Sequence, residues 1–235
     1  MQQYFSDHPL APGDIYRFSK EQAHHAHTVL HLSHERIRLV YGDTGYFAEA
    51  YMDGTIYCAK VLAVDARTNE LPIQITLCLA LIRREKMELV LQKAAELGVA
   101  RIVLFTSGRC VVHAKKEKSA RYRSIVQEAC AQCKRTLIPT VTEMVSFADL
   151  PRFKSDCNLV PYEEEAGKGT PLLKAVHGQS VTAVIGPEGG FSKAEIDVLR
   201  AEGFQPVSLG SRILRAETAC FYVCSVLGAW SEGGR

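Results

Sequence analysis

After Pro72 the sequence alternates short apolar runs with longer amphipathic stretches. The apolar run "IQITLCLALI" is followed by the stretch "KMELVLQKAAELG" and then by the run "RIVLF". The alternation continues with "CNLVPY", with "VTAVIG" before "SKAEIDVLRAEG", and with "PVSLG" before "ETACFYVCSVLGAW". Apolar strands that alternate with helices are typical of a parallel sheet covered by helices. The sequence therefore predicts an α/β domain over residues 71–235.

The first helical stretch shows which face should be buried. Its apolar positions recur at helical spacing and are Met87, Val90, Leu91, Ala94 and Ala95. Gly98 follows the last of them and is a natural helix terminator. We therefore expect a helix that ends near Gly98 with this face against the sheet.

Residues 1–70 follow a different pattern, in which short alternating strands are separated by glycine turns. Asp53 and Gly54 predict a hairpin over residues 51–56, because both residues tolerate the positive φ of a tight turn. Several short strands with such punctuation are typical of a small, mostly antiparallel barrel. The sequence therefore predicts a separate β-barrel domain over residues 1–70.

A glycine loop follows one of the predicted strands of the second domain. The stretch "AVIGPEGGFSKAE" places Gly186–Gly190 where open α/β sheets bind ligands. A phosphate loop would need backbone amides and usually a Lys. Here Pro187 removes an amide, Glu188 adds a negative charge, and no Lys follows. The loop therefore suits a neutral or cationic ligand, although a plain strand-to-helix turn would have a similar sequence.

A second loop, "LGSRILRAETA" (209–219), also follows a predicted strand. It carries Arg212 and Arg215, and a helix is expected to begin near Ala216. Glu217 lies in the first turn of that helix, where the helix dipole favours a carboxylate. Because both loops follow strand ends, we expect them to form two walls of one pocket.

The charge is unevenly distributed. Residues 1–70 hold 6 Lys and Arg against 9 Asp and Glu, whereas residues 71–235 hold 22 against 17. The densest basic stretch runs from Arg109 to Arg135. Such a stripe suits a polyanion such as RNA, although a solvated helix face would carry the same charges.

Four histidines are spaced to share one face of a single predicted helix: His24, His27, His31 and His34. They could form a metal patch, but no thiolate or carboxylate stands in register with them. A helix surface without a metal is the preferred interpretation, and no metal site is predicted.

The eight cysteines are interpreted as free thiols in a reducing cytoplasm. Cys130-x-x-Cys133 favours a helix over a redox or zinc site, and Cys220 and Cys224 fall on the apolar face of the last helix. No apolar run approaches the ~18 residues of a membrane span, and the N-terminal residues do not resemble a secretory signal.

The two loops resemble the signature segments of the ribosomal RNA small subunit methyltransferase E family, which belongs to the SPOUT superfamily. "IGPEGGFS" and "LGSRILRAETA" match two of its motifs, "REKMELVLQKAAELGV" (84–99) a third and "EACAQCKRTLIP" (128–139) a fourth. The resemblance extends over essentially the whole chain. It implies a PUA-like RNA-binding barrel over 1–70 and a SPOUT methyltransferase domain with a deep C-terminal trefoil knot over 71–235.

The resemblance also implies the chemistry. The cofactor would be S-adenosylmethionine, the product N3-methyluridine in small-subunit ribosomal RNA, and the working unit a homodimer that acts on this RNA or on the assembled subunit. The implied cofactor-binding residues are Gly186, Pro187, Glu188, Gly189, Gly190, Leu209, Gly210, Ile213 and Leu214. The expected RNA-binding residues are His31, Arg109, Lys115, Arg121, Arg123, Lys134 and Arg135.

Arg215 and Arg212 are the candidate catalytic residues, because a nearby cation eases the loss of the uracil N3 proton. Arg215 would equally suit the cofactor carboxylate or an RNA phosphate. Glu217 is conceivable as a base, but a helix cap is the preferred role.

The chain departs from the family pattern at two places. His31 stands where the family usually has Arg, and Gln132-Cys133-Lys134-Arg135 stands where it usually has Gln-Ser-Gly-Arg. Both departures are expected to lie near RNA. Two other function classes compete with the methyltransferase: a non-catalytic ribosome-binding factor that uses the basic stripe, and a nucleotide hydrolase, against which the missing loop Lys argues.

Overall fold

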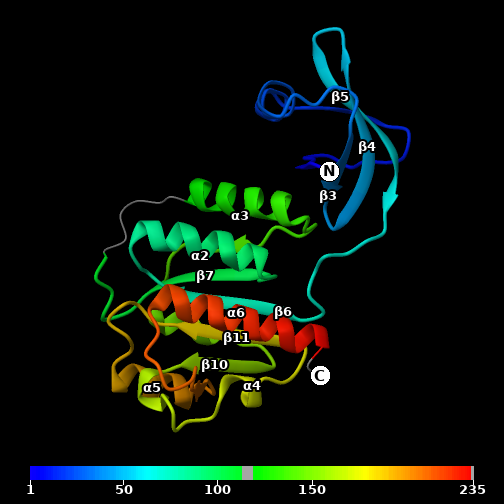
Figure 1. Cartoon of the computed structure of the whole chain (residues 1–235). Helices are drawn as coiled ribbons and strands as arrows, with labels where there is room; N and C mark the ends of the chain where they lie inside the picture. The colour runs from blue at the N-terminus through cyan, green and yellow to red at the C-terminus, as the bar shows by residue number, and fades with distance from the viewer. Residues whose placement is uncertain (113–118, 234–235) are drawn as a thin grey trace. The chain divides into compact units, whose positions relative to one another are not determined.

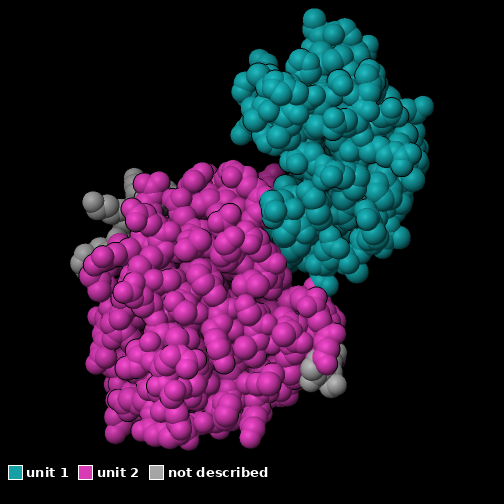
Figure 2. All heavy atoms as spheres, viewed as in Figure 1, with its two compact units in different colours: residues 1–70, 130–137 teal, residues 71–129, 138–235 magenta. Residues whose placement is uncertain are grey.

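The computed structural model describes residues 1–112 and 119–233. The chain divides into two compact units, shown in teal and magenta in Figure 2. Unit 1 comprises residues 1–70 and 130–137, and unit 2 comprises residues 71–129 and 138–235. Each unit has its own sheet and its own hydrophobic core.

Unit 1 is built on a mixed sheet of five described strands in the order β1-β3-β4-β5-β2. The strands are β1 (Gln3–Phe5), β2 (Ile15–Arg17), β3 (Arg36–Tyr41), β4 (Thr44–Asp53) and β5 (Ile56–Asp65). The β1/β3 pair is parallel and the other pairs are antiparallel. The predicted hairpin is confirmed, because Asp53 pairs with Ile56 across Gly54, whose φ is +59°.

The predicted closed barrel is not seen. The hydrogen-bonded order ends at β1 on one side and β2 on the other, and among the described residues these two strands do not pair. Each edge strand is only three residues long, so neither offers enough backbone to close the sheet. The core instead forms on one face of the sheet, where Tyr4, Tyr16 and Tyr57 make edge or tilted ring contacts with Phe18.

The four histidines do not share one helix, so that prediction is wrong. The helix α1 (Lys20–Ala23) passes directly into a π-helical turn, η1 (His24–Val29). The turn ends before His31, whose φ of +54° is incompatible with a continuing helix. Among residues 1–112 and 119–233, no group of three or more His, Cys, Asp or Glu side chains is arranged to hold a metal ion.

A buried arginine joins the segment 130–137 to the sheet of unit 1. The Arg38 side chain is only 2% exposed; its Nε donates to Asp65 (2.8 Å), and its Nη1 donates to Gln3 Oε1 (2.7 Å) and to the Lys134 carbonyl (2.9 Å). Hydrogen bonds from Arg67 and from Arg38 hold the pKa of the Asp65 carboxyl well below its ordinary value. Unit 1 is therefore assembled from two separate stretches of sequence.

Unit 2 contains a sheet of seven described strands, all paired in parallel, and the α/β prediction is confirmed (Figure 1). The order is β12-β10-β11-β6-β7-β8, with β9 also paired to β7. The strands are β6 (Gln74–Ala80), β7 (Arg101–Thr106), β8 (Thr140–Val141), β9 (Val145–Ser146), β10 (Cys157–Pro161), β11 (Ser180–Ile185) and β12 (Gln205–Val207).

The helices of unit 2 cover this sheet and contribute the face predicted from their periodicity. They are α2 (Arg84–Glu96), α3 (Ser119–Cys133, of which residues 130–133 belong to unit 1), α4 (Leu172–Ala175), α5 (Lys193–Ala201) and α6 (Ala216–Gly233), with the 3₁₀ helices η2 (Phe147–Phe153) and η3 (Glu163–Glu165). In α2 the buried residues are the five that the sequence predicts. Gly98 follows with a φ of +84°, which only glycine adopts at low cost.

The helix α6 lies beside α2 and packs on the central strands β6 and β11 (Figure 1). Cys220 and Cys224 lie on its buried face, as predicted, and burial raises the pKa of the Cys224 thiol to about 12. Thiols in such surroundings are inert. Cys130 and Cys133 lie in α3, so the predicted helix there is also confirmed. Within the described ranges, none of the helices combines the length and apolar character that a membrane span demands.

Candidate active site

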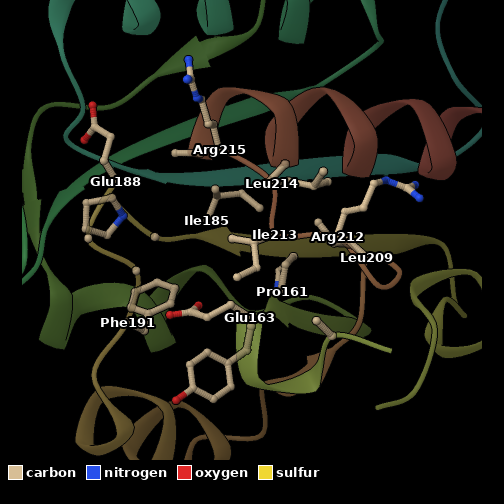
Figure 3. A pocket seen from close by; sticks show the side chains of 18 of the residues that line it. Pro161, Glu163, Ile185, Glu188, Phe191, Leu209, Arg212, Ile213, Leu214 and Arg215 are labelled. Carbon is tan, nitrogen blue, oxygen red and sulfur yellow. The ribbon is translucent and has the colours of Figure 1, made fainter. Parts of the chain in front are cut away.

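A cavity of about 340 Å³ opens at the carboxyl ends of β10 and β11 (Figure 3). Three loops line it: the residues after β10, the glycine loop after β11, and the loop between β12 and α6. All nine residues predicted to bind a cofactor lie in its wall: Gly186, Pro187, Glu188, Gly189, Gly190, Leu209, Gly210, Ile213 and Leu214. Two loops that are distant in sequence therefore form one pocket, as their positions after strand ends suggested.

The glycine loop is a tight turn in which side chains are excluded by their neighbours. The Gly190 N–H donates to the Pro187 carbonyl (2.9 Å), and Gly190 has a φ of +65°. A Cβ on Gly186 would lie 3.0 Å from the Phe191 ring. Ser192 then starts α5 with a capping box that includes Glu195. The loop thus presents bare backbone to the cavity.

Contacts from outside the cavity hold this loop in place. Glu188 Oε1 accepts a hydrogen bond from the backbone N–H of Arg83 (3.3 Å), the residue that precedes α2. Arg109 Nη1 donates to the carbonyls of Gly189 and Phe191, at 3.3 Å each. Arg109, which the sequence assigned to RNA, therefore bonds to the loop backbone.

The second loop is anchored at both of its ends. The Gly210 carbonyl accepts a hydrogen bond from the Gly167 N–H (3.1 Å), and Gly210 has a φ of +102°. At the other end Glu217 forms an ion pair with Lys86 of α2 (3.0 Å). Burial of Glu217 opposes its ionisation, but hydrogen bonds from its own backbone N–H and from Lys86 hold the pKa of its carboxyl below the ordinary value. This carboxylate links α2 to α6 and is a poor candidate for a base.

Between these anchors the loop is open. Ile213 lines the cavity with 81% of its surface exposed. Arg212 and Arg215 also line the cavity, but Figure 3 shows both side chains extending outward from its centre. The part of the chain that the structure describes supplies neither guanidinium with a hydrogen bond or ion pair. Both cations are therefore free to meet a ligand or substrate at the rim.

The remaining residues assigned to RNA lie in different surroundings. Arg121 is half exposed and pairs with Glu88 (3.2 Å), and Arg123 is exposed. Arg135 is only 3% exposed and pairs with Glu70 (2.7 Å), so its guanidinium has an internal partner. His31 is exposed. Burial lowers the pKa of Lys134, and its Nζ donates to the Ala131 carbonyl (2.9 Å).

Lys115, also assigned to RNA, lies outside the described residues. The third wall of the cavity, which contains Tyr162 and Glu163, was missed by sequence reasoning. The available signal was its position directly after the strand "CNLVP" at the same edge of the sheet.

The chemistry of the wall fits an organic ligand with a large uncharged part. Apolar side chains and exposed backbone groups make up most of the wall, and its charged groups are Glu163, Glu188, Arg212 and Arg215. Pockets of this volume and character are typical small-molecule sites. The Glu188 carboxylate is directed to the start of α2, and no Lys of residues 1–112 or 119–233 lines the cavity. The described wall therefore lacks the amide-and-Lys cradle of a phosphate loop.

Similarity to known proteins identifies the family of this chain. The RNA methyltransferase domain family matches residues 69–228. A ribosomal RNA small subunit methyltransferase E of Aquifex aeolicus is 30% identical over 83% of this chain and 90% of the relative.

Two solved structures are similar over nearly the whole chain. One is a putative methyltransferase from Legionella pneumophila in complex with the cofactor SAM, with 32% identity, a TM-score of 0.86, and coverage of 97% of this chain and 96% of the other. The second is a ribosomal RNA small subunit methyltransferase E from Neisseria gonorrhoeae bound to S-adenosyl methionine, with 29% identity, a TM-score of 0.87, and coverage of 98% and 97%. The chain belongs to the RNA methyltransferase domain family and, within it, to the ribosomal RNA small subunit methyltransferase E family.

Proposed function

We propose that this protein is an S-adenosylmethionine-dependent methyltransferase that methylates N3 of a uridine in small-subunit ribosomal RNA. The observation that carries the proposal is the cavity in which both signature loops meet, with bare glycine backbone on one side and the Arg212 and Arg215 side chains at the rim. The solved relatives that contain the cofactor support it.

The cofactor would be held by the nine loop residues that line the cavity, largely through backbone groups. When bound, it supplies a methyl group from a sulfonium and leaves as a neutral thioether, while uracil N3 loses its proton. Gly186 and Gly189 let the ligand approach the backbone closely. Phe191 and Leu214 provide apolar surface and exclude water from the cavity.

Arg215 and Arg212 would act on the substrate side. Their guanidinium groups extend outward from the cavity (Figure 3), where an incoming uracil would arrive. A cation at that position stabilises negative charge that develops on the base as the N3 proton leaves for solvent. Glu217 is held by Lys86 and keeps the start of α6, and with it Arg215, in place.

RNA would be bound by basic groups of α3 and by unit 1. Arg121 and Arg123 are the proposed phosphate contacts on α3, and the exposed His31 is proposed to contact RNA from unit 1. Replacing both arginines with Ala is expected to weaken RNA binding. The slope of log affinity against log salt concentration should become less steep by about 1.4, because each lost phosphate contact to a single strand contributes about 0.7. Fluorescence anisotropy with a ribosomal RNA fragment at several salt concentrations measures the slope.

The matched control for this test is the double variant Arg152→Ala with Lys154→Ala. It removes the same charge from another exposed part of unit 2. Its slope should stay at the wild-type value. If the two double variants change the slope equally, the α3 residues act only through net charge and the proposed contact is wrong.

Arg109 is proposed to position the cofactor loop. Replacing it with Ala removes the hydrogen bonds to Gly189 and Phe191, whose net value is about 1 kcal/mol each. S-adenosylmethionine affinity should therefore fall by about 5- to 30-fold, while the salt dependence of RNA binding stays unchanged. Calorimetry of the cofactor and anisotropy of the RNA give the two readouts. If the salt dependence of RNA binding changes while cofactor affinity stays intact, Arg109 contacts RNA and does not position the cofactor loop.

We further propose a deep trefoil knot, a homodimer and a cytoplasmic place of action. The knot is supported by family membership and by α6, which follows the second loop and packs against α2, α4, β6 and β11. The dimer is supported by apolar side chains left exposed on the neighbouring helices α2 and α6, Leu89 (42%) and Tyr222 (41%). Sedimentation at twice 26.0 kDa would support the dimer, and sedimentation at 26.0 kDa would contradict it.

The cytoplasmic place of action is supported by the eight free thiols, which suit a reducing compartment.

Two measurements test the proposed function. Isothermal calorimetry should show one S-adenosylmethionine site per chain, and ribosomal RNA from a strain lacking the protein should lose N3-methyluridine by nucleoside mass spectrometry. Restoring the intact gene should restore the nucleoside, and restoring the Arg215→Ala variant should not. A deletion strain with unchanged N3-methyluridine would contradict the proposed reaction.

A further inference from the structure

Glu163 places a carboxylate in the wall of the cavity. It is the first residue of η3, directly after Tyr162 at the end of β10. Figure 3 shows its side chain lying among the cavity residues, with the carboxylate directed toward Phe191. A Cβ built on Gly190 would lie 2.5 Å from Glu163 Oε1, so the carboxylate rests against the backbone of the glycine loop.

This carboxylate has no partner among the residues that the structure describes. The neighbouring Glu165 forms an ion pair with Arg200 (3.0 Å), and Glu188 accepts the Arg83 N–H. The Glu163 side chain forms neither kind of contact in the described ranges. Tyr162 cannot supply a positive charge, and burial, together with the adjacent Glu164 and Glu163, raises the pKa of its hydroxyl to about 12.

The charges of the wall are therefore separated in space. The two arginines extend outward at the rim, whereas Glu163 lies beside the glycine loop. A ligand that fills the cavity displaces water from the Glu163 carboxylate. An unpaired carboxylate that loses water is destabilised unless the ligand brings a positive charge.

We infer that Glu163 makes the site prefer the positively charged methyl donor over its neutral thioether product. The inference rests on the proposed function. S-adenosylmethionine and S-adenosylhomocysteine share the adenosine and amino acid parts and differ at the sulfur, which is a sulfonium in the first and a thioether in the second. A fixed negative charge in the same cavity distinguishes these two sulfur atoms, whereas apolar and backbone contacts treat them alike.

The consequence for turnover is that Glu163 favours the replacement of bound product by fresh methyl donor. Loss of the sulfonium charge on methyl transfer removes its attraction to Glu163 and leaves the carboxylate again without a bonded partner among the described residues. The product is thereby bound more weakly than the donor, and fresh donor displaces it. Glu163 acts in this scheme as a specificity-determining residue, with no proton transfer assigned to it.

The test compares the two ligands in the variant Glu163→Gln, which removes the charge and keeps the shape. Calorimetry on the full-length chain measures the Kd for S-adenosylmethionine and for S-adenosylhomocysteine. Because Glu163 is exposed to solvent when the cavity is empty, we expect the donor to bind about fivefold more weakly and the product to bind with nearly unchanged affinity. The donor-to-product preference should fall by the same factor.

Two further variants make the comparison specific. Glu143→Gln removes the same charge at an exposed residue outside the cavity wall and should keep the wild-type preference. Glu163→Asp retains the charge on a shorter side chain and should keep most of the donor-to-product preference. Thermal unfolding of each variant verifies that it is folded.

The outcomes separate the inference from the proposed function. If both ligands are weakened equally by Glu163→Gln, the residue contacts a shared part of the ligand, such as the ammonium or the ribose, and the inference is overturned. Unchanged affinities for both ligands overturn it as well. If the wild-type protein binds neither ligand, the proposed function itself fails.

Discussion

Replacing Gly189 with Val is expected to weaken S-adenosylmethionine binding by about 100-fold. A Cβ at this position would lie 3.1 Å from the Arg109 carbonyl oxygen and 3.2 Å from the Arg109 Cβ. The backbone of Arg109 cannot move far, so the branched side chain of Val would displace the glycine loop toward the cavity. Overpacking of this kind costs about 1–3 kcal/mol, and the upper end corresponds to about 100-fold in Kd. Calorimetry measures the change.

The matched control is Gly233→Val, since a Cβ there meets no atom within 4 Å and Gly233 has no positive φ. Its cofactor affinity should equal that of the wild type. Both variants should be folded by circular dichroism before they are compared. A folded Gly189→Val protein with wild-type affinity would place the cofactor somewhere other than in this cavity.

Replacing Arg215 with Ala is expected to lower the single-turnover methylation rate by about 10²–10³, the usual cost of losing a group that stabilises developing charge. Arg215→Lys keeps the charge but loses the planar pair of donors, so part of the activity should survive. The rates are measured with cofactor and RNA saturating, so that weaker binding does not enter the result.

The pH dependence of the Arg215→Ala defect separates two roles of this residue. A cation that eases deprotonation matters most at low pH, where little uracil is ionised, so the variant should recover partly as the pH rises. A defect of equal size at every pH would mean that Arg215 positions the substrate. A defect that disappears at higher cofactor concentration would make it a binding residue.

Sequence reasoning was strongest where local pattern and tertiary structure agree. The apolar face of α2, the hairpin at Gly54 and the buried Cys220 and Cys224 follow from periodicity or turn chemistry alone, and the structure confirms them. The meeting of the two signature loops could be anticipated as well. Both follow strands of a parallel sheet, whose carboxyl ends share one edge.

Contacts between residues distant in sequence could not be predicted in this way. Arg135 looked like part of a basic surface, yet it is buried against Glu70, a residue 65 positions earlier. The histidine spacing suggested one helix, but the π-helical turn at His24–Val29 and the positive φ of His31 interrupt it. Glu163 has no distinctive local pattern, and only its proximity to Gly190 in three dimensions brings it into the cavity.

The buried Arg38 contacts also determine when unit 1 can finish folding during synthesis. The ribosome releases residues 1–70 first, but the Lys134 carbonyl that accepts from Arg38 and the Arg135 that pairs with Glu70 emerge more than sixty residues later. Until then Arg38 keeps Asp65 and Gln3 but lacks the Lys134 carbonyl, and Glu70 lacks the Arg135 guanidinium. Leaving one member of a buried ion pair without its partner costs about 3–5 kcal/mol. The N-terminal unit therefore cannot reach its final stability before much of the chain that forms unit 2 has left the ribosome. A fragment that stops at residue 70 is an incomplete domain.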